Sequence, residues 1–167
     1  QTCALPISRA SLAEDFGVEP RAITFTSTAS EALALALGSE LHPGGVLISS
    51  AGEHRGARAL AAAHEAAGGR VALVPLDAGG RWSRDALDAL LSTHSEDGAA
   101  PVLLLALASG ELGSIQPALS QPPLASRSAV TAVLDGVQLD GALPLRFADT
   151  GATHLALSSA KIGGPFG

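Results

Sequence analysis

The sequence predicts an α/β domain built around a mostly parallel β-sheet. Short apolar runs alternate along the chain with longer amphipathic stretches, which is the pattern of consecutive βαβ units. Residues 102–108 form a continuous apolar run, as in strands that are buried on both faces. Hydrophobic residues make up 47% of the 167 residues and aromatic residues only 3%, so we expect a core filled mainly by aliphatic side chains and alanine.

Local signals place each element in order. The expected helices are Ser11–Phe16, which ends at Gly17; Glu31–Leu37, capped by Ser30; Arg55–Ala67, closed by Gly68 and Gly69; and Arg84–Leu91, capped by Ser83. The expected strands are Ala22–Thr26, Val46–Ser49, Val71–Pro75, Val102–Ala108, Val130–Leu134 and Leu155–Ser158. Helix Glu31–Leu37 is apolar nearly all round, which predicts burial on every side. Residues 116–127 contain three prolines and are expected to form mostly loop or a short helix.

Composition argues against several classes of partner. The formal charge of −6 disfavours a basic nucleic-acid surface, and no apolar run approaches the roughly 20 residues that span a bilayer, so we expect neither nucleic acid nor membrane as a partner. Cys3 is the only cysteine, and the five histidines lack metal-ligand spacing, so no metal site is expected. A reducing, cytoplasmic location is compatible with this cysteine usage.

Both ends of the chain predict a fragment. Gln1–Ile7 has no helical or strand period and resembles the translation of a sequencing adapter, so it is expected to be non-native. Residues 8–167 are expected to form one domain that is truncated at its C-terminus, because Gly167 lies in a Gly-Gly-Pro-Phe-Gly run where no element has closed.

Side chains with chemical functions follow the expected strands. They are Ser27–Glu31 after the first strand, Glu53 and His54 after the second, Ser109–Glu111 after the apolar run, Asp135 and Gln138 after the fifth, and Lys161 after the last. Ligands of open α/β sheets gather beyond the carboxyl ends of strands, so we expect these groups to converge. Lys161 is the only lysine beside nine arginines, which indicates that an amine is needed there.

Pyridoxal phosphate (PLP) is the cofactor that these residue types favour. The Lys161 amine can form a Schiff base with the aldehyde, which arginine cannot do. The Asp135 carboxylate can keep the pyridine nitrogen protonated, and His54 can lie over the ring and move protons. Gln138 can bond the ring hydroxyl. Small hydroxyl residues that open the helix at Ser30 suit a phosphate, although alone they predict only a helix cap.

Five blocks of the sequence resemble one enzyme family. The blocks are FTSTASEALALAL at 25–37, SSAGEH at 49–54, LASGELGSIQP at 107–117, LDGVQLDGALPL at 134–145 and SSAKIGGPFG at 158–167. In this order and spacing they resemble the cysteine desulfurases of the class V aminotransferase-like, fold-type I PLP enzymes. The resemblance implies the large domain of that fold, a three-layer α/β/α sandwich with a mostly parallel central sheet.

The same resemblance implies a site and an activity. The implied PLP ligands are Lys161 as the Schiff-base amine, Asp135 at the pyridine nitrogen, Gln138 at the ring hydroxyl, His54 stacked on the ring, and Ala29, Ser30 and Ser158 at the phosphate. Lys161 and His54 are the implied catalytic residues. The implied reaction removes sulfur from L-cysteine, with a nucleophilic cysteine expected beyond Gly167. A homodimer and a sulfur-acceptor protein are implied as partners.

Departures from the family pattern keep other functions open. Gly110 stands where the family usually has asparagine, and Ala160 stands where it usually has histidine. Because both changes remove polar side chains, the alternatives are another class V enzyme, namely a transaminase, selenocysteine lyase or epimerase, or a non-catalytic module with this fold.

Overall fold

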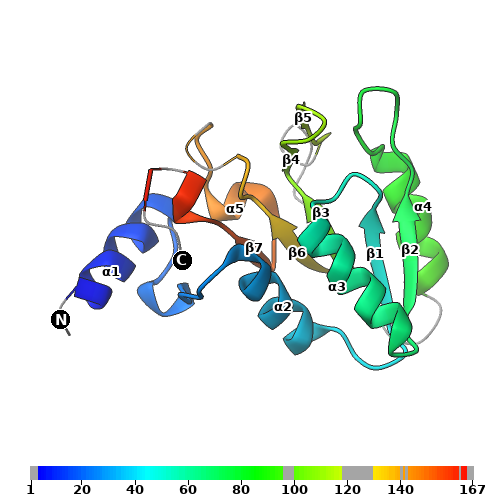
Figure 1. Cartoon of the computed structure of the whole chain (residues 1–167), viewed down its shortest axis with the longest axis horizontal. Coiled ribbons are helices and arrows are strands. Elements are labelled where there is room, and N and C mark those ends of the chain that lie inside the picture. Colours follow the sequence, from blue (N-terminus) through cyan, green and yellow to red (C-terminus); the bar gives the residue numbers. More distant parts are fainter. Residues whose placement is uncertain are drawn as a thin grey trace.

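The computed structural model describes residues 4–95, 100–117, 130–139, 141, 143–161 and 163–164. Among them, five strands form one parallel sheet in the order β2-β1-β3-β6-β7 (Figure 1). The strands are β1 Val46–Ser50, β2 Arg70–Val74, β3 Val102–Ala106, β6 Thr131–Asp135 and β7 His154–Ala156, and a small antiparallel hairpin is formed by β4 Ala108–Ser109 and β5 Ser114–Ile115. The predicted α/β class and parallel sheet are therefore confirmed.

Helices cover both faces of the sheet. They are α1 Ala4–Phe16, α2 Ala29–Glu40, α3 Arg55–Ala66, α4 Arg84–Ser95 and α5 Phe147–Thr150, with short 3-10 turns η1 Pro20–Ala22 and η4 Ser159–Lys161. Leu47 of β1 belongs to a core cluster with Leu33 of α2 and Ala57 of α3. Its neighbour Ile48 belongs to a second cluster with Leu87 of α4. Successive strand residues point to opposite faces, so these two clusters make three layers, as predicted.

The order of the strands reverses beside β1. The chain passes from β1 to β2 on one side, and β3 then pairs with the other side of β1. In open α/β sheets such a reversal opens a crevice beyond the carboxyl ends of the two central strands, and ligands bind there. The topology therefore places the expected site after Ser50 and after Ala106.

Several predicted element ends are confirmed. Helix α1 ends at Phe16, and Gly17 follows with a φ of +68°, a conformation that costs glycine little. Ser83 caps α4, because its Oγ accepts a hydrogen bond of 3.0 Å from the Ala86 N–H. The strands of the sheet begin and end within two residues of five of the six predicted runs.

The predicted strand at Ala22–Thr26 was wrong. Ala22 ends η1 and Ile23 is extended, but residues 23–26 join no ladder among the described strands. Ile23 donates its N–H to the Pro20 carbonyl, and its own carbonyl accepts a bond from Arg9 Nε. β-propensity selects an extended backbone, whereas a strand also requires a neighbour that shares its hydrogen bonds.

Two expectations about α2 also need correction. Thr28, not Ser30, is the N-cap: its side chain accepts the Glu31 N–H at 3.1 Å, and Glu31 Oε2 accepts the Ser27 N–H at 2.7 Å. This reciprocal pair places Ser30 inside the first turn. The helix is not buried on every side, because only one face meets the sheet and Leu35 is 56% exposed.

The beginning of the chain and the proline-rich loop complete the comparison. Residues 4–7 are helical within α1, although no helical period was expected there. Only residues 116 and 117 of the predicted 116–127 loop lie within the described residues. No helix in the described part of the chain is long and apolar enough to cross a membrane.

Candidate functional site

A cavity of about 470 Å³ lies beyond the carboxyl ends of the central strands. Its wall is built from the segments after β1, β3 and β6, from the start of α2, and from Lys161. Six of the seven predicted site residues line it, namely Ala29, Ser30, His54, Asp135, Gln138 and Lys161. The topology brings together residues that are more than 130 positions apart in the chain, as the strand-end argument predicted.

Two helix N-termini meet at this cavity. Thr28, Ala29 and Ser30 come from the first turn of α2, and His54 is the N-cap of α3. Gly56 allows the close approach, because a Cβ at this position would lie 2.7 Å from Ser30 Oγ. The free N–H groups and positive dipole ends of two 12-residue helices make this wall suitable for an anion such as phosphate.

Asp135 supplies a buried carboxyl group to the cavity. It is the last residue of β6, is 9% exposed, and accepts the Val137 N–H at Oδ1 over 2.9 Å. Burial raises its pKa, although the Val137 N–H and a smaller electrostatic effect of His54 oppose the rise. A carboxyl group in this position can pair with a cationic ligand group.

His54 is exposed to solvent, in contrast to the buried Asp135. Its Nδ1 accepts the Gly56 N–H at 3.2 Å, so in this neutral state the ring proton lies on Nε2. The backbone of α3 thus fixes the ring through one nitrogen. The other nitrogen remains able to exchange a proton with a ligand.

Lys161 ends the short turn η4 and is exposed at the cavity. Its backbone N–H donates to the Ser158 carbonyl at 3.1 Å. Ser158 does not line the cavity, so its structural part is to hold the turn that carries the lysine. Ala29 and Ser30, the other two predicted phosphate ligands, line the cavity.

Gln138 and Gly110 occupy adjacent positions in the wall. A Cβ at Gly110 would lie 2.8 Å from the Gln138 side-chain carbonyl carbon, so the amide occupies space that any side chain at position 110 would need. Position 110 thus lacks the asparagine that is usual in the family, and the side-chain amide of Gln138 lies beside it. This arrangement could be found only in the folded chain.

Glu53 is named above among the side chains that follow the strands, but the sequence argument gave it no role in the site. It is 2% exposed, and both carboxylate oxygens accept hydrogen bonds: Oε1 from Ser50 Oγ at 2.6 Å and Oε2 from the Ala106 N–H at 2.8 Å. Burial is the main cause that raises its pKa to about 7, and the charge of Asp135 adds to the rise. Its place directly after a strand was the available signal.

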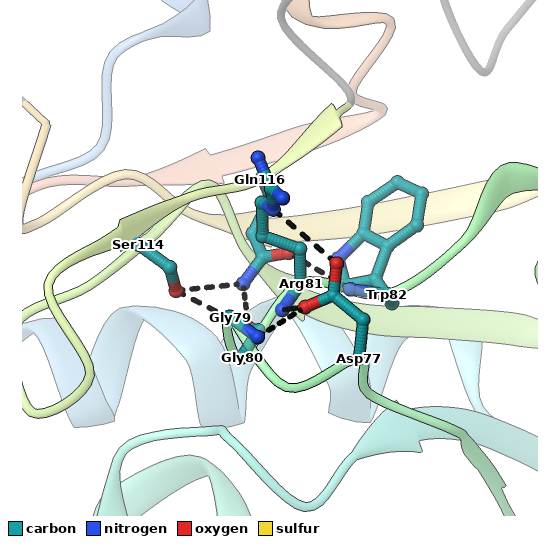
Figure 2. Close-up of polar contacts among 7 residues, drawn as sticks. All are labelled: Asp77, Gly79, Gly80, Arg81, Trp82, Ser114 and Gln116. Atoms are coloured by element: carbon teal, nitrogen blue, oxygen red, sulfur yellow. Dashed lines mark hydrogen bonds and ion pairs between the residues drawn. The ribbon is translucent and has the colours of Figure 1, made fainter.

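A second cavity, of about 750 Å³, lies between the β2–α4 connection and the end of the hairpin. Figure 2 shows that polar contacts organise one wall of it: Asp77 accepts the Gly79 and Arg81 N–H groups, and Gln116 bonds to the backbone of Gly80 and Trp82. None of the seven predicted site residues lines this larger cavity. Because reactive groups converge in the smaller cavity, that one is the candidate site.

Comparisons with known proteins agree with this geometry. The sequence profile of the Aminotransferase class-V family matches residues 2–167. An IscS-like cysteine desulfurase from Mycobacterium tuberculosis (strain H37Rv) is 26% identical over 168 residues, which cover 96% of this chain and 42% of that protein. The similarity to cysteine desulfurases that the sequence blocks predicted is therefore confirmed.

Solved structures share the fold. A NifS-like protein superposes with a TM-score of 0.84 at 22% identity, over 98% of this chain and 45% of its own. A structure of SspA in complex with cysteine gives a TM-score of 0.80 at 25% identity, over 97% of this chain and 46% of its own. This chain thus spans less than half the length of the relatives that it matches.

Proposed function

Because this chain belongs to the Aminotransferase class-V family, we propose that its strand-end cavity binds pyridoxal phosphate and serves a cysteine desulfurase. The proposed reaction removes sulfur from L-cysteine. Support comes from the similarity to an IscS-like cysteine desulfurase and to a protein solved in complex with cysteine. A homodimer, a sulfur-acceptor protein as partner and a cytoplasmic location are parts of the same proposal, and they rest on the family resemblance.

The residues of the cavity fit this cofactor. The two helix N-termini suit its phosphate, and the buried carboxyl group of Asp135 suits its pyridine nitrogen. Gln138 offers an amide for the ring hydroxyl, and His54 offers an imidazole for the ring face. When bound, PLP supplies an aldehyde for covalent attachment and a ring that accepts electrons from a substrate bond.

The chain's own residues then have distinct roles. Lys161 provides the amine that attaches the cofactor and afterwards moves a proton at the substrate. Asp135 holds the proton on the ring nitrogen by its negative charge. His54, whose ring is fixed through Nδ1, moves protons at Nε2. Ala29 and Ser30 bind the phosphate through the start of α2, and Ser158 orients the lysine turn.

One observation carries the proposal. The only lysine of the chain and the buried Asp135 line the same cavity, at the edge of the sheet where the strand order reverses. An amine and a carboxyl group are the two side chains on which PLP chemistry depends. Arginine, which the chain uses nine times elsewhere, cannot replace that amine.

Covalent attachment at Lys161 is the direct test. PLP is added to the chain, borohydride reduces any Schiff base, and peptide mass spectrometry locates the adduct. We expect a visible absorbance band and an adduct on Lys161. Lys161→Ala and Lys161→Arg are expected to lose both, the arginine variant serving as a control that keeps the positive charge. Because the chain has no other lysine, an adduct found only at the N-terminal amine would overturn the proposal.

The reaction class needs a separate measurement. Alanine formed from L-cysteine supports desulfuration, when the assay supplies a cysteine nucleophile in the protein and a thiol reductant that releases the transferred sulfur as sulfide. A keto acid formed from an amino-acid donor supports a transaminase instead.

A further inference from the structure

Glu53 joins the carboxyl ends of two central strands beneath the cavity. It follows β1, and its Oε1 accepts from the hydroxyl of Ser50, the last residue of that strand. Its Oε2 accepts the backbone N–H of Ala106, the last residue of β3. The side chain is 2% exposed, so both of its oxygens are bonded within the protein. When the carboxyl group is protonated, Oε1 can donate to the Ser50 hydroxyl instead of accepting from it. A carboxyl group is thus buried where the sheet opens, and the proposed roles above do not use it.

The backbone that Glu53 holds is also the backbone that positions Asp135. Ala106 is the register partner of Asp135 across the β3–β6 pair. The next N–H along, that of Leu107, donates to the Asp135 carbonyl at 2.8 Å. The end of β3 therefore has one N–H held by Glu53 and the following one held by Asp135. A shift at Glu53 would be transmitted to Asp135 through two adjacent peptide groups.

The two carboxyl groups also interact through their charges. Burial raises the pKa of Glu53 to about 7, although the hydrogen bonds from Ser50 and Ala106 oppose the rise. The negative charge of Asp135 is a smaller cause that adds to it. Burial raises the pKa of Asp135 too, but the Val137 N–H and His54 oppose that effect. The other titratable groups at the cavity, Glu111 and Lys161, are exposed to solvent. The Val137 N–H and His54 favour the ionised form of Asp135, and the charge of Asp135 in turn favours the protonated form of Glu53.

We propose that Glu53 is a positioning residue for Asp135 and that the pair holds one proton, on Glu53, which is released when a cationic ring nitrogen binds to Asp135. The inference deepens the proposed function, because the cationic group is the pyridine nitrogen of PLP. The physical reason is that a cation beside Asp135 cancels the charge that favours the protonated form of Glu53. The released proton passes to solvent.

The first experiment tests the pair without any cofactor. The carboxyl carbons of glutamate are labelled with ¹³C, and the Glu53 signal, assigned by its loss in Glu53→Gln, is followed by NMR against pH. We expect a midpoint near 7 in the unmodified chain and a lower midpoint in Asp135→Asn, which removes the neighbouring charge. A midpoint that Asp135→Asn leaves unchanged would overturn the pairing, whether or not the chain binds PLP.

The second experiment measures PLP affinity by equilibrium dialysis from pH 6 to pH 8. Glu53→Gln keeps both contacts, since its amide can accept from Ala106 and donate to Ser50, and it removes only the titration. We expect affinity equal to that of the unmodified chain at pH 6 and several-fold weaker affinity at pH 8. PLP binding and proton release are linked. For each factor of ten by which the unmodified chain binds PLP more tightly than Glu53→Gln at pH 8, the titration midpoint of Glu53 must fall by about one pH unit when PLP binds.

Controls separate positioning from general disruption. Glu111→Gln makes the same change at an exposed carboxylate of the same cavity, where water screens the charge. The ratio of its PLP affinity to that of the unmodified chain is expected not to vary with pH. Glu53→Ala removes both contacts and is expected to weaken PLP binding at every pH. A ratio for Glu53→Gln that is constant from pH 6 to pH 8 would show a purely structural residue and overturn the proton release. If PLP does not bind at all, the proposed function fails while the NMR result still decides the pairing.

Discussion

The amide of Gln138 lies directly over Gly110, so closely that a Cβ at position 110 would come within 2.8 Å of its carbonyl carbon. Residue 110 follows the β4 strand, and residue 138 follows β6. Two loops from different strand ends therefore share one place in the cavity wall. The absence of a side chain on one of them allows the side chain of the other to lie there.

Gly110→Ala is expected to move the Gln138 amide and weaken PLP binding about three- to tenfold. The cost in the free energy of unfolding is expected to stay below about 1 kcal/mol, because the atoms displaced are the end of an exposed, flexible side chain. PLP titration and urea unfolding measure the two effects. In the double variant Gly110→Ala/Gln138→Ala, the alanine at 110 has no glutamine amide to displace, so its effect on PLP affinity should disappear. If the loss of affinity in the double variant equals the sum of the two single losses, this account is wrong.

Thr28→Ala is expected to lower the free energy of unfolding by about 1 kcal/mol, since it removes the oxygen that caps α2. Ser30→Ala is the matched control. Ser30 lies inside the first turn and is not the cap, so its loss should change stability by less than about 0.5 kcal/mol. Urea unfolding of both variants checks the difference. Equal losses, or a larger loss for Ser30→Ala, would mean that the helix begins where the sequence first indicated.

The stability of the chain should depend on pH through Glu53. Its folded pKa of about 7 lies above the ordinary 4.5, so the folded state binds more protons than the unfolded state between these values. The contribution is therefore fully present below about pH 4.5 and is lost as the pH rises through 7. Relative to Glu53→Gln, which does not titrate, the unmodified chain is expected to lose about 3 kcal/mol between pH 4.5 and pH 8.

Urea unfolding of the two proteins at several pH values measures this difference directly. Groups that do not interact with Glu53 contribute equally to both proteins, so their contributions cancel when the two free energies are subtracted. We expect the free energy of unfolding of the unmodified chain, minus that of Glu53→Gln, to fall as the pH rises. If this difference rises or stays constant, Glu53 is not buried as a carboxyl group beside Asp135.

Local signals were enough for much of the fold and for the choice of most residues that line the candidate site. The ends of α1 and α4 follow from Gly17 and Ser83, because a positive φ and a side-chain cap are properties of a few adjacent residues. Most strands of the sheet follow from their apolar runs. Lys161 and Asp135 were predicted from the chemistry of their amine and carboxyl groups, and the type of group that a residue carries does not depend on the fold.

The errors arose where a local signal needed a distant partner. Residues 22–26 have the composition of a strand, but no described strand pairs with them. Helix α2 is apolar all round, yet the sheet covers only the face that contains Leu33 and Leu37.

The sequence by itself determined which residue types were available: one amine, a carboxyl group after a strand, and small hydroxyl residues at the start of a helix. Tertiary structure decided which of them meet and in what state of charge. Glu53 bonds to Ala106, 53 residues away, and acquires its raised pKa from burial and from Asp135 on a third strand. Hydrogen bonds, desolvation and charge act through space, so these properties exist only after the strands are assembled.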